Sequence, residues 1–100
     1  MYVFVAVASL VGKFLRSHLP MQPLVEAAYI TTGSRSVYVC VLVAHAERAV
    51  YDLCVTLEKT LSEQFPGYVF KVEHRAHEGK ENPRRTMLFG YDLAYVRPSS

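Results

Sequence analysis

Residues 24–45 read LVEAAYITTGSRSVYVCVLVAH, and this stretch decides the fold of the chain. Two apolar runs rich in β-branched residues flank a short polar break at residues 32–36, TGSRS. Gly33 supplies the backbone freedom that a tight reversal needs, and the serines can bond nearby backbone groups. The pattern therefore predicts a β-hairpin with strands over residues 25–31 and 37–44.

The second strand of this hairpin contains no charged residue. Alternation along the strand separates a face of valines from a face of mixed apolar residues. The valine face carries Val37, Val39, Val41 and Val43, and the other face carries Tyr38, Cys40, Leu42 and Ala44. A strand that is apolar on both sides must be covered on both sides. We expect helices to cover one face and a second copy of the chain to cover the other.

The composition also favours self-association. The chain has 100 residues, which is the size of a single domain, 1–100. It is 51% hydrophobic, and a small apolar domain often buries the excess in an interface between subunits. We therefore predict a homodimer, formed through the uncovered sheet face or through an edge strand. The net charge of +2 is too small to indicate polyanion binding by itself.

The N-terminal segment fits two secondary structures. As a helix, it has an apolar stripe at spacings of three and four residues, formed by Phe4, Val7, Val11, Phe14 and Leu15. As a strand, Tyr2–Ala8 is a β-branched run that leads into a short helix. We favour the helix over most of the region. Pro20 and Pro23 end it, because proline cannot continue a helix interior.

The second half of the chain predicts one helix and two strands. The helix covers Glu47–Gln64 and has an apolar stripe formed by Val50, Leu53, Cys54, Leu57 and Leu61. Pro66-Gly67 ends it, and a strand over Tyr68–Arg75 follows. A polar loop covers Ala76–Arg85, and a last strand covers Met87–Val96.

These elements predict an α+β two-layer sandwich of order αββαββ. Its sheet is four-stranded and mainly antiparallel, with the helices on one face. If Tyr2–Ala8 is a strand, the alternative is a ferredoxin-like fold, βαββαβ plus an extra strand.

The N-terminus and the cysteines indicate the compartment. The chain lacks the basic start of a signal peptide, and its first uncharged stretch ends at Lys13, too short to span a bilayer. Cys40 and Cys54 fall at positions that we expect to be interior. We predict reduced thiols in a cytoplasmic protein that does not associate with membranes.

From Leu24 to Val43 the chain resembles the nucleotidyltransferase fold. The resemblance rests on the strand VEAAYI, the turn Gly33-Ser34-Arg35 and the next strand, and with the flanking elements it covers residues 10–75. In that family, two alternating carboxylates on this strand hold the divalent metal that bridges nucleotide phosphates. Val37 and Val39 occupy those positions here. The resemblance therefore implies a degenerate domain without the catalytic carboxylates, which keeps a nucleotide or anion site at the turn.

Two places are candidate ligand-binding sites. Turn amides and a guanidinium can cradle an anion, and the residues that offer them are Gly33, Ser34, Arg35 and Ser36. Asp92 interrupts the otherwise apolar last strand. It marks either a sheet edge, where a charge discourages further pairing, or a polar group in a small ligand pocket.

The loop over residues 80–85 concentrates positive charge at Lys80, Arg84 and Arg85. A basic loop beside aromatic strands can bind single-stranded nucleic acid, but interleaved glutamates dilute the field and favour an ordinary solvated loop. His74 and His77 lie three residues apart, a spacing that on a strand puts them on opposite faces, which is poor geometry for chelation. In the loop they could converge with Glu78, near His45, on zinc or nickel, but the pattern favours a His74 that ends an apolar face and a His77 exposed in the loop. We predict no metal site and an exposed His77.

The sequence offers no catalytic set of residues. We predict a small non-catalytic binding or regulatory module that acts as a homo-oligomer and carries no cofactor. Two alternatives stay open. One is a degenerate nucleotidyltransferase-like domain with a nucleotide or anion site at Gly33-Ser34-Arg35. The other is single-stranded nucleic-acid binding through the basic loop 80–85, which makes nucleic acid the less favoured partner.

Overall fold

The computed structural model describes residues 2–80, 82 and 87–98 of the chain. These residues form two α-helices, a short 3₁₀ helix and one four-stranded sheet, so the predicted α+β class is confirmed. In chain order the elements are α1 (Tyr2–His18), η1 (Leu19–Met21), β1 (Val25–Thr32), β2 (Ser36–Val43), α2 (Arg48–Gln64), β3 (Val69–Ala76) and β4 (Asp92–Val96).

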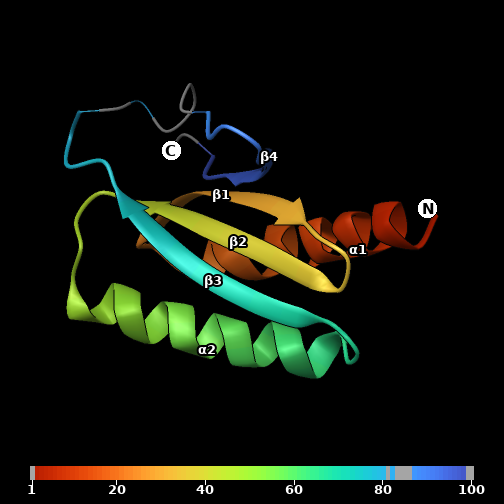
Figure 1. Ribbon diagram of the computed structural model, residues 1–100. Helices are drawn as coiled ribbons and strands as arrows, with labels where there is room; N and C mark the ends of the chain where they lie inside the picture. Colours follow the sequence, from red (N-terminus) through yellow and green to blue (C-terminus); the bar gives the residue numbers. More distant parts are fainter. Residues whose placement is uncertain (1, 81, 83–86, 99–100) are drawn as a thin grey trace.

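The strands form an open mixed sheet in the order β3-β2-β1-β4 (Figure 1). β1 pairs antiparallel with both β2 and β4, whereas β2 and β3 are parallel. The parallel pair follows from the connection through α2, because parallel neighbours need a long crossover rather than a hairpin. β3 and β4 are therefore the two edge strands, and β2 lies inside the sheet.

α1 is helical from Tyr2, so the alternative in which Tyr2–Ala8 forms a strand is wrong. A buried stripe runs along this helix and into η1, formed by Val7, Val11, Leu15 and Leu19. Burying this stripe against the sheet outweighs the weak strand preference of valine. Phe4 was also expected in the stripe, and its side chain lies outside the described part of the chain.

α2 begins one residue later than predicted, with Glu47 as its N-cap residue, and ends at Gln64. Its buried stripe consists of Val50, Cys54, Leu57 and Leu61. The Phe65 N–H bonds back to the Leu61 carbonyl, and Gly67 takes a φ of 95° that other residues rarely adopt. β3 then runs back along the helix (Figure 1). Within the described ranges, no helix is both long enough and apolar enough to cross a membrane.

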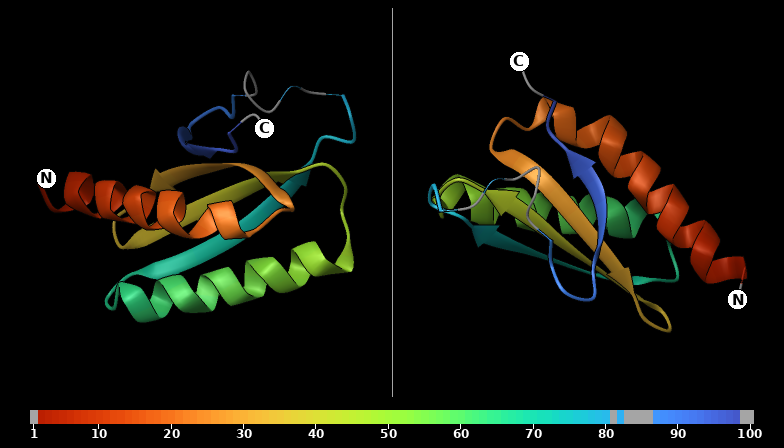
Figure 2. Two further views of the ribbon diagram at one scale, coloured as in Figure 1. Left: turned by 180° about the vertical axis from the view of Figure 1, so that it is seen from behind. Right: turned by 90° about the horizontal axis from the view of Figure 1, so that it is seen from above.

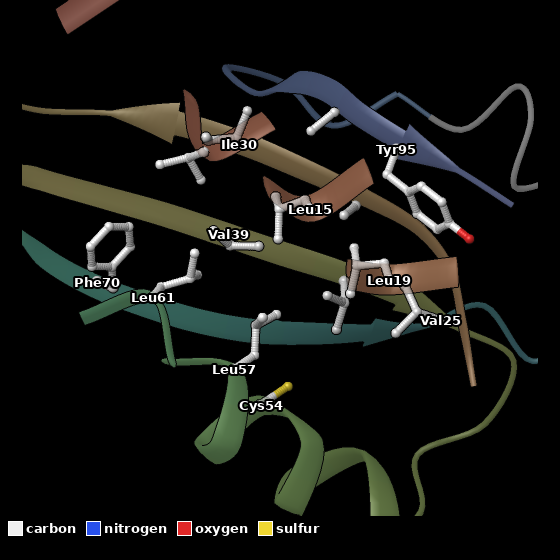
Figure 3. Close-up of a cluster of buried hydrophobic side chains, with 14 of the residues drawn as sticks. Leu15, Leu19, Val25, Ile30, Val39, Cys54, Leu57, Leu61, Phe70 and Tyr95 are labelled. Carbon is white, nitrogen blue, oxygen red and sulfur yellow. The ribbon is translucent and has the colours of Figure 1, made fainter. Parts of the chain in front are cut away.

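The main core lies between the two helices and one side of the sheet, which we call the helix-covered face (Figure 2). The β2 residues buried there are the four predicted valines, Val37, Val39, Val41 and Val43. Figure 3 shows Leu15 of α1 and Leu57 and Leu61 of α2 converging on this face. The alternation of β2 therefore predicts its helix-covered side correctly.

The opposite side of the sheet, the second face, has a smaller buried cluster formed by Ala27, Tyr29, Cys40 and Leu42. Residues 87–91 were predicted to begin the last strand, but they form no strand, and Leu88 and Tyr91 pack on this cluster instead. The Tyr91 N–H bonds to the Leu88 carbonyl, and Gly90 has a φ of 83°, so a turn interrupts the strand pattern. Residues 87–91, the covering segment, thus cover the centre of a face that we expected a second copy to cover (Figure 2).

Candidate functional site

The predicted anion site is the tight turn between β1 and β2. The Gly33 N–H donates to the Ser36 carbonyl at 2.8 Å, which closes the hairpin. The Arg35 carbonyl accepts the Val69 N–H at 2.8 Å, so the turn also anchors the start of β3. The residues from Gly33 to Arg35 are exposed, and Ser36 is half-buried. Backbone groups of the turn therefore bond within the sheet, and the exposed residues of the turn lie at one end of the sheet.

Asp92 lies at the same end of the sheet as this turn. It opens β4 and pairs with Ile30, close to the end of β1. Asp92 is exposed and belongs to an edge strand. Across the described residues, no hydrogen bond or ion pair joins Asp92 to the turn.

Lys80, the first residue of the predicted basic loop, lies at the other end of the sheet. Lys80 follows β3, whose last residue, Ala76, pairs with the last residue of β2. Lys80 is exposed, and its N–H donates to the His77 carbonyl at 2.9 Å. Arg84 and Arg85 lie outside the described residues. The length of β3 therefore separates Lys80 from the Gly33 turn.

His77 is buried, with 9% of its surface exposed, so the prediction of an exposed loop residue is wrong. Its Nε2 lies 2.9 Å from Oε1 of Glu26 on β1, and its Nδ1 accepts the Gly79 N–H at 2.9 Å. Because Nδ1 accepts, Nε2 carries the proton and donates to the carboxylate. This contact, the His77–Glu26 clasp, joins the segment after β3 to β1 and uses both ring nitrogens.

The other histidines do not gather into a metal site. His45 is exposed, and His74 on β3 makes an edge-on ring contact with Tyr51 of α2 at a centroid distance of 4.6 Å. In the part of the chain that the structure describes, no three potential ligand side chains converge to hold a metal ion.

Both cysteines are free and buried, as predicted. Cys40 belongs to the cluster on the second face, and Cys54 belongs to the helix-covered core. Burial, with smaller effects of Cys40 and Glu58, raises the pKa of the Cys54 thiol to about 11. Burial also raises the pKa of Cys40. Such thiols carry little thiolate at neutral pH and are poor nucleophiles.

The positions that the nucleotidyltransferase resemblance assigns to carboxylates lie in the core. Val37 and Val39 are each 1% exposed and belong to the cluster formed with α1 and α2. The helices cover both side chains, so neither side chain can contact a bound nucleotide in this fold.

A different site lies along the open edge of β3. The Val69 N–H donates to the Arg35 carbonyl, and the His77 N–H donates to the Val43 carbonyl. The odd-numbered residues of β3 therefore bond to β2, because backbone groups alternate in direction along a strand. The residues whose N–H and C=O point away from the sheet are Phe70, Val72, His74 and Ala76. No strand of the described residues pairs with this side.

A groove of about 450 Å³ runs beside this edge, between α2 and β3. Its walls include Tyr51 and Val55 from α2 and Val72 and His74 from β3. Tyr51 and Val55 are 55% and 70% exposed, although both side chains are largely apolar. They lie four residues apart and so share one flank of the helix, beside its buried stripe. We call this feature the β3 groove.

One outward-pointing group of the edge already has a partner. The Glu58 carboxylate, which reaches over from α2, accepts the Val72 N–H at 3.0 Å. An exposed edge strand is a template for pairing with another chain, and a charge placed there is a common protection. Glu58 therefore occupies the middle of the edge, and the outward groups of Phe70 and His74 lie on either side of it.

Sequence reasoning identified each element of this edge but not the site that they form. The signal that could have found it is the pair Tyr51 and Val55, which lie outside the predicted apolar stripe of their helix. In comparisons with known proteins, no family model, no curated protein and no solved structure matches the chain.

Proposed function

We propose that this protein is a small non-catalytic binding module, of two-layer αββαββ architecture, that binds an extended polypeptide segment along the open edge of β3. One observation carries the proposal: the outward backbone groups of β3 lie directly beside the partly apolar β3 groove. A segment that adds to a sheet edge gains backbone hydrogen bonds, and pockets beside the edge select its side chains. The β3 edge offers both outward backbone groups and an adjacent groove.

The backbone groups of Phe70 and His74 can pair with an incoming strand on either side of the contact between Glu58 and Val72. β3 has 8 residues, so a segment of ordinary strand length can pair along it. Full pairing displaces the Glu58 carboxylate from the Val72 N–H. A segment that pairs along the whole edge must therefore offset the loss of this hydrogen bond, which disfavours poorly matched segments.

The two sides of β3 favour different side chains in the bound segment. On the groove side, Tyr51, Val55 and Val72 offer apolar contact, which favours apolar residues there. The other side presents an exposed row of alternating charge, Lys71, Glu73 and Arg75. Cross-strand pairs of opposite charge are favourable, so we expect a ligand in which apolar and charged residues alternate.

Selection of a displayed library of random heptapeptides on the protein, immobilised at low density, tests this proposal. We expect enrichment of sequences with alternating apolar and charged residues. His74→Pro removes one outward N–H, and edge strands tolerate proline where that group bonds to no neighbouring strand. His74→Ala is the matched control, because it also removes the ring but keeps the N–H.

The selected peptides should bind His74→Ala within a few-fold of the wild type and should bind His74→Pro at least about tenfold more weakly. Circular dichroism and thermal melting of both variants establish that the fold is kept. Equal binding to His74→Pro and to the wild type contradicts backbone pairing at this edge. Failure to enrich any peptide on the wild type contradicts the proposed function itself.

A further inference from the structure

We infer that the segment bound at this edge is β3 of a second copy of the chain, paired antiparallel about a two-fold axis at Val72. The inference rests on the proposed function and names the partner for the same edge. It is carried by the direction of the backbone groups, by the charge pattern of β3 and by the exposed flank of α2.

The direction of the backbone groups allows this pairing. A two-fold axis that passes through one residue of β3 pairs even-numbered residues with even-numbered residues. The outward groups belong to the even-numbered residues, so each such pair can exchange two N–H···O bonds. With the axis at Val72, Val72 faces its own symmetry mate and Phe70 faces His74 of the second copy.

The charge pattern of β3 disfavours the register centred on Glu73 and is compatible with the one centred on Val72. With the axis at Val72, Lys71 of each copy faces Glu73 of the other, which gives two symmetry-related pairs of opposite charge. With the axis at Glu73, the two glutamates face each other and Lys71 faces Arg75, so like charges meet.

A third register, with the axis at His74, also brings opposite charges together, since Glu73 then faces Arg75. It pairs only residues 72–76 of the strand, whereas the axis at Val72 pairs residues 69–75. Both registers give two pairs of opposite charge, so the longer pairing favours the register centred on Val72.

The flank of α2 adds apolar contact to the same dimer. Because Glu58 reaches the Val72 N–H, the helical turn from Val55 to Glu58 lies at the level of the axis. Symmetry brings Val55 of one copy toward Val55 of the other, and burial of this 70% exposed side chain is favourable. Tyr51, one turn away on the same flank, extends the contact.

Glu58 opposes the association. In the single chain its carboxylate holds the Val72 N–H, which in the dimer bonds to the Val72 carbonyl of the second copy. The two Glu58 carboxylates also approach the axis, where like charges repel. We expect Glu58→Ala to lower the Kd of the dimer about tenfold. Glu63→Ala, at an exposed position of the same helix, is the control and should leave the Kd unchanged.

Sedimentation equilibrium of the full chain tests the register through charge reversal. Lys71→Glu and Glu73→Lys each create like-charge pairs across the axis, and each should weaken the dimer about tenfold or more. In an equimolar mixture of the two variants, one copy is acidic at both positions and the other is basic at both. The mixture should therefore dimerise at least as tightly as the wild type. Lys13→Glu makes the same charge change on an exposed position of α1 and should have no effect.

Dimerisation of the mixture, with weak dimerisation of each variant alone, supports the inference. Equal dimerisation of the wild type and of both single variants overturns it, and so does a wild type that stays monomeric at high micromolar concentration. In that last case, peptide binding that depends on the His74 N–H would leave the proposed function standing with a different partner. If the peptides also fail to bind, both the inference and the proposed function are contradicted.

Discussion

The two faces of the sheet are covered in different ways, although the same strand contributes to both. On the helix-covered face, the valines of β2 pack against α1 and α2, whose backbone hydrogen bonds are internal to each helix. On the second face, Cys40 and Leu42 lie under the covering segment, which contains a turn but no strand or helix. A cover with few backbone bonds opens at a lower free energy than packed helices. Burial alone therefore does not tell how firmly each side of a strand is held.

The same substitution should have a different cost on the two faces. Leu57 of α2 is 1% exposed and Leu42 of β2 is 0% exposed. Leu57→Ala leaves a cavity between packed elements, so we expect it to lower the free energy of unfolding by about 3–4 kcal/mol. Leu42→Ala should cost about 2 kcal/mol, because the covering segment can move into the space. Urea denaturation of the two variants measures the difference.

Leu10→Ala, at an exposed position of α1, is the control for this pair and should change the free energy of unfolding by less than about 1 kcal/mol. An equal or larger cost for Leu42→Ala than for Leu57→Ala contradicts the comparison. It would show that the covering segment is packed as rigidly as the helices.

Loss of the His77–Glu26 clasp should also make the covering segment on the second face open more readily. His77 lies at the start of the chain that leads from β3 toward the covering segment. His77→Ala removes both contacts of the ring, and we expect a cost of about 1 kcal/mol in the free energy of unfolding. Amide hydrogen exchange at Tyr91 should accelerate more than exchange at Val39.

His45→Ala provides the control for the clasp, because His45 is exposed. It should alter neither the stability nor the exchange rates. If His77→Ala lowers the stability but leaves exchange at Tyr91 unchanged, the clasp holds the end of the sheet and not the cover of the second face.

The helix-covered face could be predicted from the sequence, and the cover of the second face could not. The alternation of β2 and the helical period of α2 each depend on neighbours along the chain, so the pattern alone identifies them. Residues 87–96 continue the alternation of a strand through Gly90. Their interruption depends on packing against Tyr29 and Leu42, which are distant in sequence, and such tertiary contacts override local strand preference.

The candidate site could not be predicted from the sequence, for a related reason. Alternation over residues 69–76 predicts a half-exposed strand but does not give its neighbours. β3 is an edge because β4 pairs with β1 on the far side of the sheet. In the same way, the burial of His77 depends on Glu26, which lies on a strand much earlier in the chain. Strand order is a property of the whole fold, so no local pattern contains it.

The smallest expected difference concerns the two thiols, one on each face. Burial is the main reason that the pKa of the Cys54 thiol rises from its ordinary 9.0 to about 11. As the pH rises through this window, the unfolded chain loses the Cys54 proton while the folded chain keeps it. The free energy of unfolding therefore falls with rising pH. We expect this thiol to contribute a fall of about 1 kcal/mol between about pH 9 and about pH 11.

Cys54→Ala removes that contribution, so urea denaturation at the two ends of this pH range should show a smaller fall than in the wild type. Cys40→Ala is the matched variant on the second face, and because Cys40 is a smaller cause of the Cys54 shift than burial, it should keep most of the slope that belongs to Cys54. Equal slopes for Cys54→Ala and the wild type would mean that the Cys54 thiol is solvated in the folded chain, from the side of the β3 groove that it lines.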